Sequence, residues 1–141
     1  MPAIAWDERF VLDVPKMDST HQEFVDLVNA LSDAPDDAFL AALDALVEHT
    51  VGHFNQEDRW MAESKFGPMC HVGEHQHVLG VMRLVRDRVA GGDVDVGRKL
   101  AGELGPWFEH HAATMDTILA SHMAQVGYDP SRPLEPAEAA G

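Results

Sequence analysis

Apolar residues recur through most of this chain at the three- and four-residue spacings that place them on one side of an α-helix. The first stripe predicts a helix over residues 18–31. The second predicts a helix that follows a turn at 32–37 and ends near Ser64. Two further stripes predict helices over 70–89 and 95–126. No segment alternates apolar and polar residues as a half-buried strand would. The pattern therefore predicts an all-α protein.

Prolines and glycines mark where the predicted helices break. Pro15 is expected to prevent an early helix and to keep residues 1–17 as an extended arm. The Gly-Pro pair at 67–68 and the Gly-Gly-Asp run at 91–93 predict tight turns between helices. A second Gly-Pro pair, at 105–106, lies inside the last helix and predicts a kink or a restart there. Four helices joined by short turns predict an up-down-up-down antiparallel four-helix bundle with an extended N-terminal arm.

Length and composition limit the kind of protein this is. At 141 residues the chain can bury one core, and we expect one domain over 1–126 and a loosely ordered tail over 127–141. The net charge of −14 argues against nucleic-acid partners, which need a basic surface, and against anionic membranes. A single cysteine, Cys70, excludes an internal disulfide. The N-terminus does not resemble a secretion signal and no run is long enough to span a membrane, which predicts a cytoplasmic protein.

Five histidines and two carboxylates are spaced so that four helices can bring them together around metal ions. They are His21, His53, Glu57, His71, His75, His111 and Asp116. Two pairs within this set are four residues apart, and residues so spaced lie on one face of a helix. Taken singly, each residue is more often an ordinary core or surface residue. The ordered set over four helices is what indicates a metal site.

The ligand types favour two metal ions over one. Imidazole and carboxylate ligands without thiolates suit iron, manganese or zinc, and seven ligands are too many for one four-coordinate zinc ion. If two ions were six-coordinate, five histidines, two bridging carboxylates and a bridging oxide or hydroxide would leave one position open for a small diatomic ligand. One spacing fits less well. His111 and Asp116 are five residues apart, about 140° around an ideal helix, which is compatible with a bridging carboxylate but does not predict one.

The other histidines are expected to lie outside this set. His77 and His110 neighbour candidate ligands but point about 100° or more away from them on an ideal helix, so both should face solvent. His49 and His122 are candidates for supporting contacts to the ligands.

Four motifs, in their order, carry a family resemblance. They are His21 within residues 17–22, His53-Phe54 with Glu57 and Met61, His71 with His75, and Trp107-Phe108 before His111 with Asp116. Over about residues 6–122 the chain resembles the hemerythrins, and more narrowly the single-domain bacterial hemerythrins.

The resemblance implies a four-helix bundle that binds O2 reversibly at a non-haem di-iron centre, as a carrier, store or sensor rather than an enzyme. The implied cofactors are two iron ions joined by an oxo or hydroxo bridge, with O2 held as a hydroperoxide after two-electron transfer. Nitric oxide, peroxide and azide-like anions are further candidate ligands, and a partner protein is not indicated. The implied assignment is His71, His75 and His111 to one iron, His21 and His53 to the other, and Glu57 and Asp116 as bridges.

Two departures from the family pattern leave other functions open. Residues 66–68 are Phe-Gly-Pro where the family often has Tyr-Pro. Residues 112–115 include two alanines where large aliphatic residues commonly enclose the ligand pocket. A roomier pocket would suit a di-iron oxidase, a peroxidase or a nitric-oxide-handling enzyme. A metal or redox sensor that acts through a partner is a third hypothesis, and zinc or manganese could replace iron. A ferritin-like site is less compatible, because only Glu74 and His77 have its Glu-x-x-His spacing.

Overall fold

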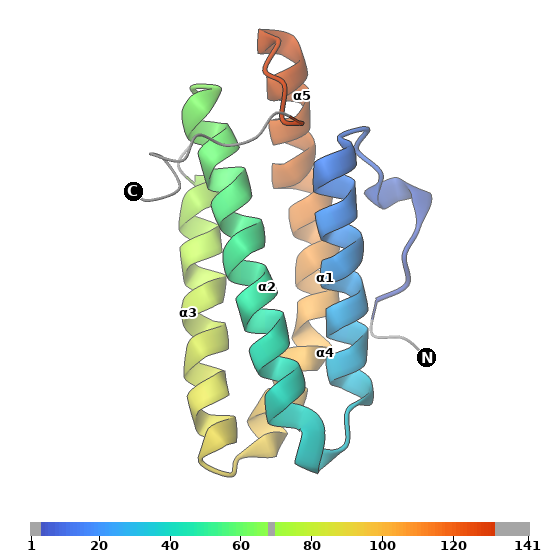
Figure 1. The fold of residues 1–141 in the computed structure, drawn as a ribbon, viewed down its shortest axis with the longest axis vertical. Coiled ribbons are helices and arrows are strands. Elements are labelled where there is room, and N and C mark those ends of the chain that lie inside the picture. Colours follow the sequence, from blue (N-terminus) through green and yellow to red (C-terminus); the bar gives the residue numbers. More distant parts are fainter. Residues whose placement is uncertain (1–3, 68–69, 132–141) are drawn as a thin grey trace.

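The computed structural model describes residues 4–67 and 70–131, and within them all regular secondary structure is helical. The elements are the 3₁₀ turn η1 (Glu8–Phe10), α1 (Pro15–Asp33), α2 (Asp36–Glu63), α3 (Cys70–Ala90), α4 (Val94–His111), the π-helical turn η2 (Ala112–Asp116) and α5 (Thr117–Val126). Figure 1 shows α1, α2 and α3 side by side with a fourth rod formed by α4, η2 and α5. Successive rods run in opposite directions, which confirms the predicted up-down-up-down bundle.

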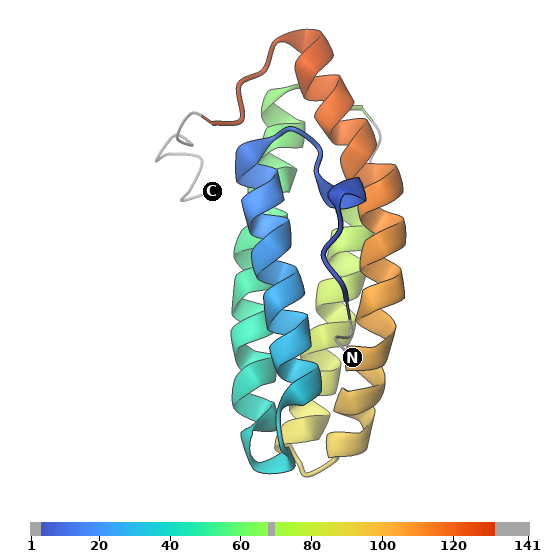
Figure 2. The same cartoon turned by 90° about the vertical axis from the view of Figure 1, so that its right-hand side faces the viewer.

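The N-terminal arm lies against α1 and α4 (Figure 2). Asn29 on α1 holds it by two hydrogen bonds, accepting from the backbone N–H of Ile4 at 2.8 Å and donating to the Ile4 carbonyl at 2.8 Å. Further along the arm, the Phe10 ring packs against Phe108 of α4 at 5.4 Å between centroids. The arm therefore packs onto the hydrophobic core and covers part of it.

The expectation about Pro15 was wrong, and so was the restart expected at Pro106, whereas the kink expected there stays a prediction. Pro15 does not prevent an early helix, since it is the first residue of α1; its missing N–H belongs to a helix end where no partner is needed, and its fixed φ suits the first turn. Pro106 does not restart the last helix, because α4 continues through it to His111. The irregular segment is η2, which divides the single helix predicted over 95–126.

Some sequence predictions stay untested by the fold. Pro68 and residues 132–141 lie outside the described residues, so the predicted break at Pro68 and most of the predicted tail are not addressed. Tyr128, just after α5, donates a hydrogen bond from its hydroxyl to Glu63 at 2.6 Å. No helix in residues 4–67 and 70–131 combines the length and apolarity needed to cross a membrane. The domain boundary and the cytoplasmic location remain predictions.

The core consists of two hydrophobic clusters, and on α1 and α2 the candidate ligands lie between them. The larger cluster includes Phe24, Phe54 and Phe108, and the smaller includes Met17 and Trp60. On α1, His21 stands between Met17 and Phe24, and on α2, Glu57 stands between Phe54 and Trp60. The apolar stripe of each of these two helices thus continues on both sides of its candidate ligands.

Close packing at the foot of the bundle supplies a test of the fold. A Cβ atom placed on Gly97 of α4 would clash with the Phe39 ring and would lie 2.7 Å from Cγ2 of Val89, whereas one on Gly102 of the same helix would meet nothing within 4 Å. Overpacking costs about 1–3 kcal/mol, while replacing a helical glycine by alanine gains up to about 1 kcal/mol. We therefore expect Gly97→Ala to lower the melting temperature in thermal unfolding and Gly102→Ala to raise it. Equal stabilisation by both would contradict this packing.

Candidate metal centre

The seven candidate ligands converge at one level of the bundle, and all are buried. His21 comes from α1, His53 and Glu57 from α2, and His71 and His75 from α3. On the fourth rod, His111 is the last residue of α4 and Asp116 is the last residue of η2. Their donor atoms form two overlapping groups, each within 4.8 Å: Glu57, His71, His75, His111 and Asp116 in one, and His21, His53 and Glu57 in the other. The structure therefore brings together every residue of the predicted set.

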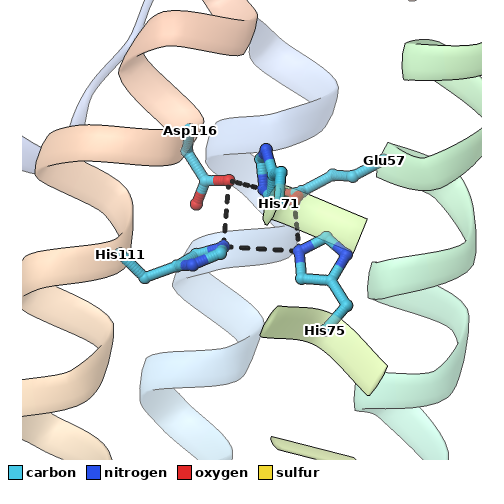
Figure 3. Close-up of side chains that lie close together, drawn as sticks. All are labelled: Glu57, His71, His75, His111 and Asp116. Atoms are coloured by element: carbon cyan, nitrogen blue, oxygen red, sulfur yellow. Dashed lines mark hydrogen bonds and ion pairs between the residues drawn. The ribbon is translucent and has the colours of Figure 1, made fainter. Parts of the chain in front are cut away.

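Each carboxylate directs one oxygen toward each group of histidines. Oε1 of Glu57 is 3.3 Å from Nε2 of His75, and its Oε2 is 2.9 Å from Nε2 of His53. Asp116 behaves in the same way, with Oδ1 at 3.0 Å from Nε2 of His71 and Oδ2 at 3.1 Å from Nε2 of His21. Figure 3 shows Glu57 and Asp116 on opposite sides of the three-histidine group. This is the arrangement that a pair of carboxylates bridging two ions requires.

The π-helical turn resolves the awkward five-residue spacing. Across η2 the backbone N–H of Thr117 donates to the carbonyl of Ala112, five residues earlier, and the Thr117 hydroxyl donates to the same oxygen at 2.8 Å. A π-turn contains one residue more than an α-turn, so a residue at i+5 falls close to where i+4 would fall in an α-helix. His111 and Asp116 consequently share a face, with Nε2 and Oδ1 3.3 Å apart.

Buried polar atoms at the centre lack the partners that burial normally demands. Oε1 of Glu57, both carboxylate oxygens of Asp116 and Nε2 of His71 approach one another or neighbouring histidine nitrogens at 3.0–3.4 Å, but none has a partner in hydrogen-bonding geometry within the described residues. Leaving a buried charged group unpaired is costly, and these atoms point toward the middle of the cluster. A positive ion in each half would satisfy them. Oxygen and imidazole donors of this kind suit iron, manganese or zinc.

Two acidic residues support the histidines from behind, and the sequence alone had not identified them in this role. Nδ1 of His75 donates to Asp58 at 2.7 Å, and Nδ1 of His111 donates to Glu74 at 2.8 Å. Such a partner fixes the tautomer of a histidine and directs its other nitrogen toward a metal. Glu74 also accepts a hydrogen bond from the Trp107 indole at 2.9 Å. Because Glu74 is engaged in this way and His77 is exposed, the ferritin-like pairing of these two residues is not formed.

Aromatic rings line the lower side of the centre. The Phe54 ring stacks on His75 at 4.0 Å, and the Trp107 ring stacks on His111 at 4.7 Å. Phe108 meets the edge of His21 at 5.1 Å. These contacts fix the imidazole planes and keep water away, which strengthens every electrostatic interaction inside the site.

Of the remaining histidines, two lie as predicted, and the two candidates for supporting contacts make no hydrogen bond to a ligand within the described residues. His77 and His110 are exposed, as predicted. His49 lies behind His53, with ring centroids 5.9 Å apart, and its Nε2 pairs with Glu23 at 3.3 Å. His122 donates to the Ser64 carbonyl at 2.9 Å and takes no part in the cluster.

Protons balance the charge of the site when no metal is bound. Burial lowers the pKa of His21, but the close contacts of its Nε2 with the carboxylates of Asp116 and Glu57 outweigh burial and raise that pKa to about 10. Burial also lowers the pKa of His71, and its contacts with Asp116 and Glu57 again outweigh burial and raise that pKa to about 9. Burial raises the pKa of Glu57, yet the charge of His53 and hydrogen bonds from neighbouring histidines bring it well below its ordinary value. The metal-free site therefore holds carboxylates paired with imidazolium groups, and metal ions would displace those protons.

Comparison with known proteins places the whole arrangement in context. Residues 12–122 match the family model described as "Hemerythrin HHE cation binding domain". A Bacteriohemerythrin of Ralstonia nicotianae is 42% identical over 130 residues, which cover 92% of this chain and 95% of the relative. A Bacteriohemerythrin of Methylococcus capsulatus is 24% identical, covering 84% of this chain and 95% of its own. A Myohemerythrin of Sipunculus nudus is 29% identical, covering 79% of this chain and 86% of its own.

The π-turn generates a prediction about chain length. Deleting Ala113, which is exposed, should convert η2 into a regular α-turn and leave the histidine and the aspartate four residues apart on one face. Inserting one alanine after Ala113 should rotate the aspartate by about 100° away from the cluster. We expect the deletion variant to keep its metal content, measured by elemental analysis, and the insertion variant to lose metal. Full metal content in the insertion variant would show that η2 does not set the geometry.

The pKa shifts generate a prediction about pH. His21 and His71 bind protons more tightly in the folded than in the unfolded protein, where the value is 6.5. The stability they contribute is complete below pH 6.5 and is lost as the pH rises toward 9–10. The melting temperature of metal-free protein should therefore fall between pH 6.5 and 10. Metal-loaded protein is the control, and its melting temperature should change much less. A metal-free profile that is flat over this range would contradict the assignment.

Proposed function

The chain belongs to the hemerythrin family, and on that premise we propose that it binds O2 reversibly at two iron ions held by the seven-residue cluster. His71, His75 and His111 would hold one ion, His21 and His53 the other, and Glu57 and Asp116 would bridge them. The observation that carries the proposal is the division of each carboxylate between the two histidine groups. Glu57 is 3.3 Å from His75 through Oε1 and 2.9 Å from His53 through Oε2.

The unequal number of histidines supports small-ligand binding at one ion. With both carboxylates shared, the half that contains only His21 and His53 has one protein ligand fewer than the half with three histidines. That half keeps a position for O2, and iron supplies the electrons that reversible O2 binding requires. Phe24 and Phe108 lie next to this side, with centroids 5.9 Å from His53 and 5.1 Å from His21 respectively. An apolar, buried surround favours an uncharged diatomic ligand over water.

The residues of the cluster also argue for binding rather than catalysis. The imidazole Nε2 atoms and the carboxylates of the site face one another, and Asp58 and Glu74 hold Nδ1 of His75 and His111. This arrangement suits the holding of metal ions better than proton transfer to a substrate. Of the two alanines that suggested a roomy pocket, Ala112 is buried and Ala113 is exposed. Only one of them can enlarge an internal pocket. The protein would serve as an O2 carrier, store or sensor, with an oxidase or peroxidase as the alternative that the experiment separates.

We expect metal-free protein loaded anaerobically with two equivalents of Fe(II) to take up about one O2 per pair of ions. Uptake should produce a charge-transfer absorption band that disappears under vacuum and returns on re-aeration. His53→Gln should abolish the band, because it removes one of two histidines from the O2-binding half. His77→Gln, on the same bundle but exposed, is the matched control and should behave as the parent. Loss of the band after one exposure, with consumption of further O2 or peroxide in turnover, would favour the enzyme instead.

A further inference from the structure

The two halves of the cluster differ in what stands behind their histidines. On the three-histidine side, Asp58 accepts from Nδ1 of His75 at 2.7 Å and Glu74 accepts from Nδ1 of His111 at 2.8 Å. Glu74 is itself held by the Trp107 indole at 2.9 Å. A carboxylate behind an imidazole makes its free nitrogen a stronger donor and holds the ring in position for a metal.

The two-histidine side has no such support. Nδ1 of His21 and Nδ1 of His53 are buried and make no hydrogen bond within the described residues. Nδ1 of His71 is in the same condition, so carboxylates support two of three histidines in one half and neither histidine in the other. Removing a supporting partner of this kind typically lowers metal affinity by about 10–100-fold. The three-histidine half also has one ligand more.

The surroundings of the two halves differ as well. A hollow of about 290 Å³ lies between α1 and α2, and its lining includes Glu23, Glu48, His49 and His53. His53, itself buried, is one of the residues that line this polar and acidic surface hollow. The other half borders a cavity of about 210 Å³ at His71, whose lining includes Phe66, Met115 and Ile118. A hydrated cation crosses a polar, acidic passage more readily than an apolar one.

We propose that the two metal ions bind with unequal affinity and in a fixed order. The half formed by His71, His75 and His111 fills first and retains its ion. The half formed by His21 and His53 fills second, releases its ion first, and exchanges it through the hollow between α1 and α2. Asp58 and Glu74 are positioning residues that create the difference. The inference rests on the two-ion site proposed above but does not depend on O2 binding.

The test is a titration of metal-free protein with Co(II), followed by calorimetry and by the visible absorption of bound cobalt. We expect two steps whose dissociation constants differ by at least about tenfold. In the double variant Asp58→Asn with Glu74→Gln, Co(II) affinity of the three-histidine half should fall by about 10–100-fold, so that the two steps move together or exchange order. The absorption of the first Co(II) bound then shifts toward that of the two-histidine half. Two equal steps in the parent protein, or a double variant that keeps the parent's first-step affinity and spectrum, would overturn the proposal.

Single-ligand variants identify which half fills first. His53→Ala should bind one Co(II) at close to the parent's first-step affinity, whereas His111→Ala should lose that tight step. A His53→Ala protein that binds no Co(II) while remaining helical by circular dichroism would contradict the order. Glu23→Gln with Glu48→Gln tests the exchange route, since removal of their charge should slow chelator extraction of the second ion severalfold and leave the first unchanged. Unchanged extraction of the second ion would reject the hollow as the route.

The outcome also separates this inference from the proposed function. Two equal Co(II) steps in a protein that still binds O2 reversibly after iron loading would refute the unequal order alone. Binding of only one Co(II) by the parent protein would remove the two-ion site and the proposed function with it.

Discussion

Burial of two carboxylates in the middle of a helical bundle is the constraint on which the rest of this structure depends. Glu57 and Asp116 are both fully buried, and an unpaired buried charge is too costly for a domain of this size to tolerate. Their charge must be met by positive charge from the histidines that face them, as protons in the metal-free protein or as metal ions. The buried carboxylates and the histidines that face them therefore stabilise the bundle only as a complete set.

The hydrophobic clusters on either side of the ligand layer make this set possible. The aromatic side chains of the larger cluster, with Phe54 against His75 and Trp107 against His111, hold the imidazole rings by stacking and exclude water. The N-terminal arm contributes by placing Phe10 against Phe108. Asp58 and Glu74 are only partly exposed and stand at the edge of the layer. They add negative charge behind one half of the site, so that its two halves are chemically unlike although the bundle looks regular.

Regular α-helices alone would not bring all seven candidate ligands together at one level of the bundle. The four-residue pairs on α2 and α3 need no adjustment, because an α-helix already places both members on one face. The pair on the fourth rod does need one, and the structure supplies it as a single π-turn. Thr117 satisfies the displaced carbonyl of Ala112 with both its N–H and its hydroxyl. A departure from α-helical hydrogen bonding is thus kept at the one place where the ligand geometry requires it.

The sequence by itself determined the helices, their order and the seven residues that meet, because apolar periodicity and ligand spacing are local properties that survive in any reasonable packing. It could not determine how Pro15 and Pro106 would behave, since the effect of a proline depends on where the helix begins and on which carbonyls lack partners. Nor could it identify Asp58 and Glu74 as the supports of His75 and His111, because each of those contacts joins different helices. The π-turn could not be predicted from the sequence either, although the five-residue spacing of His111 and Asp116 is consistent with it. Only the tertiary structure fixes the rotation of each rod about its axis, and that rotation decides which carboxylate faces which histidine.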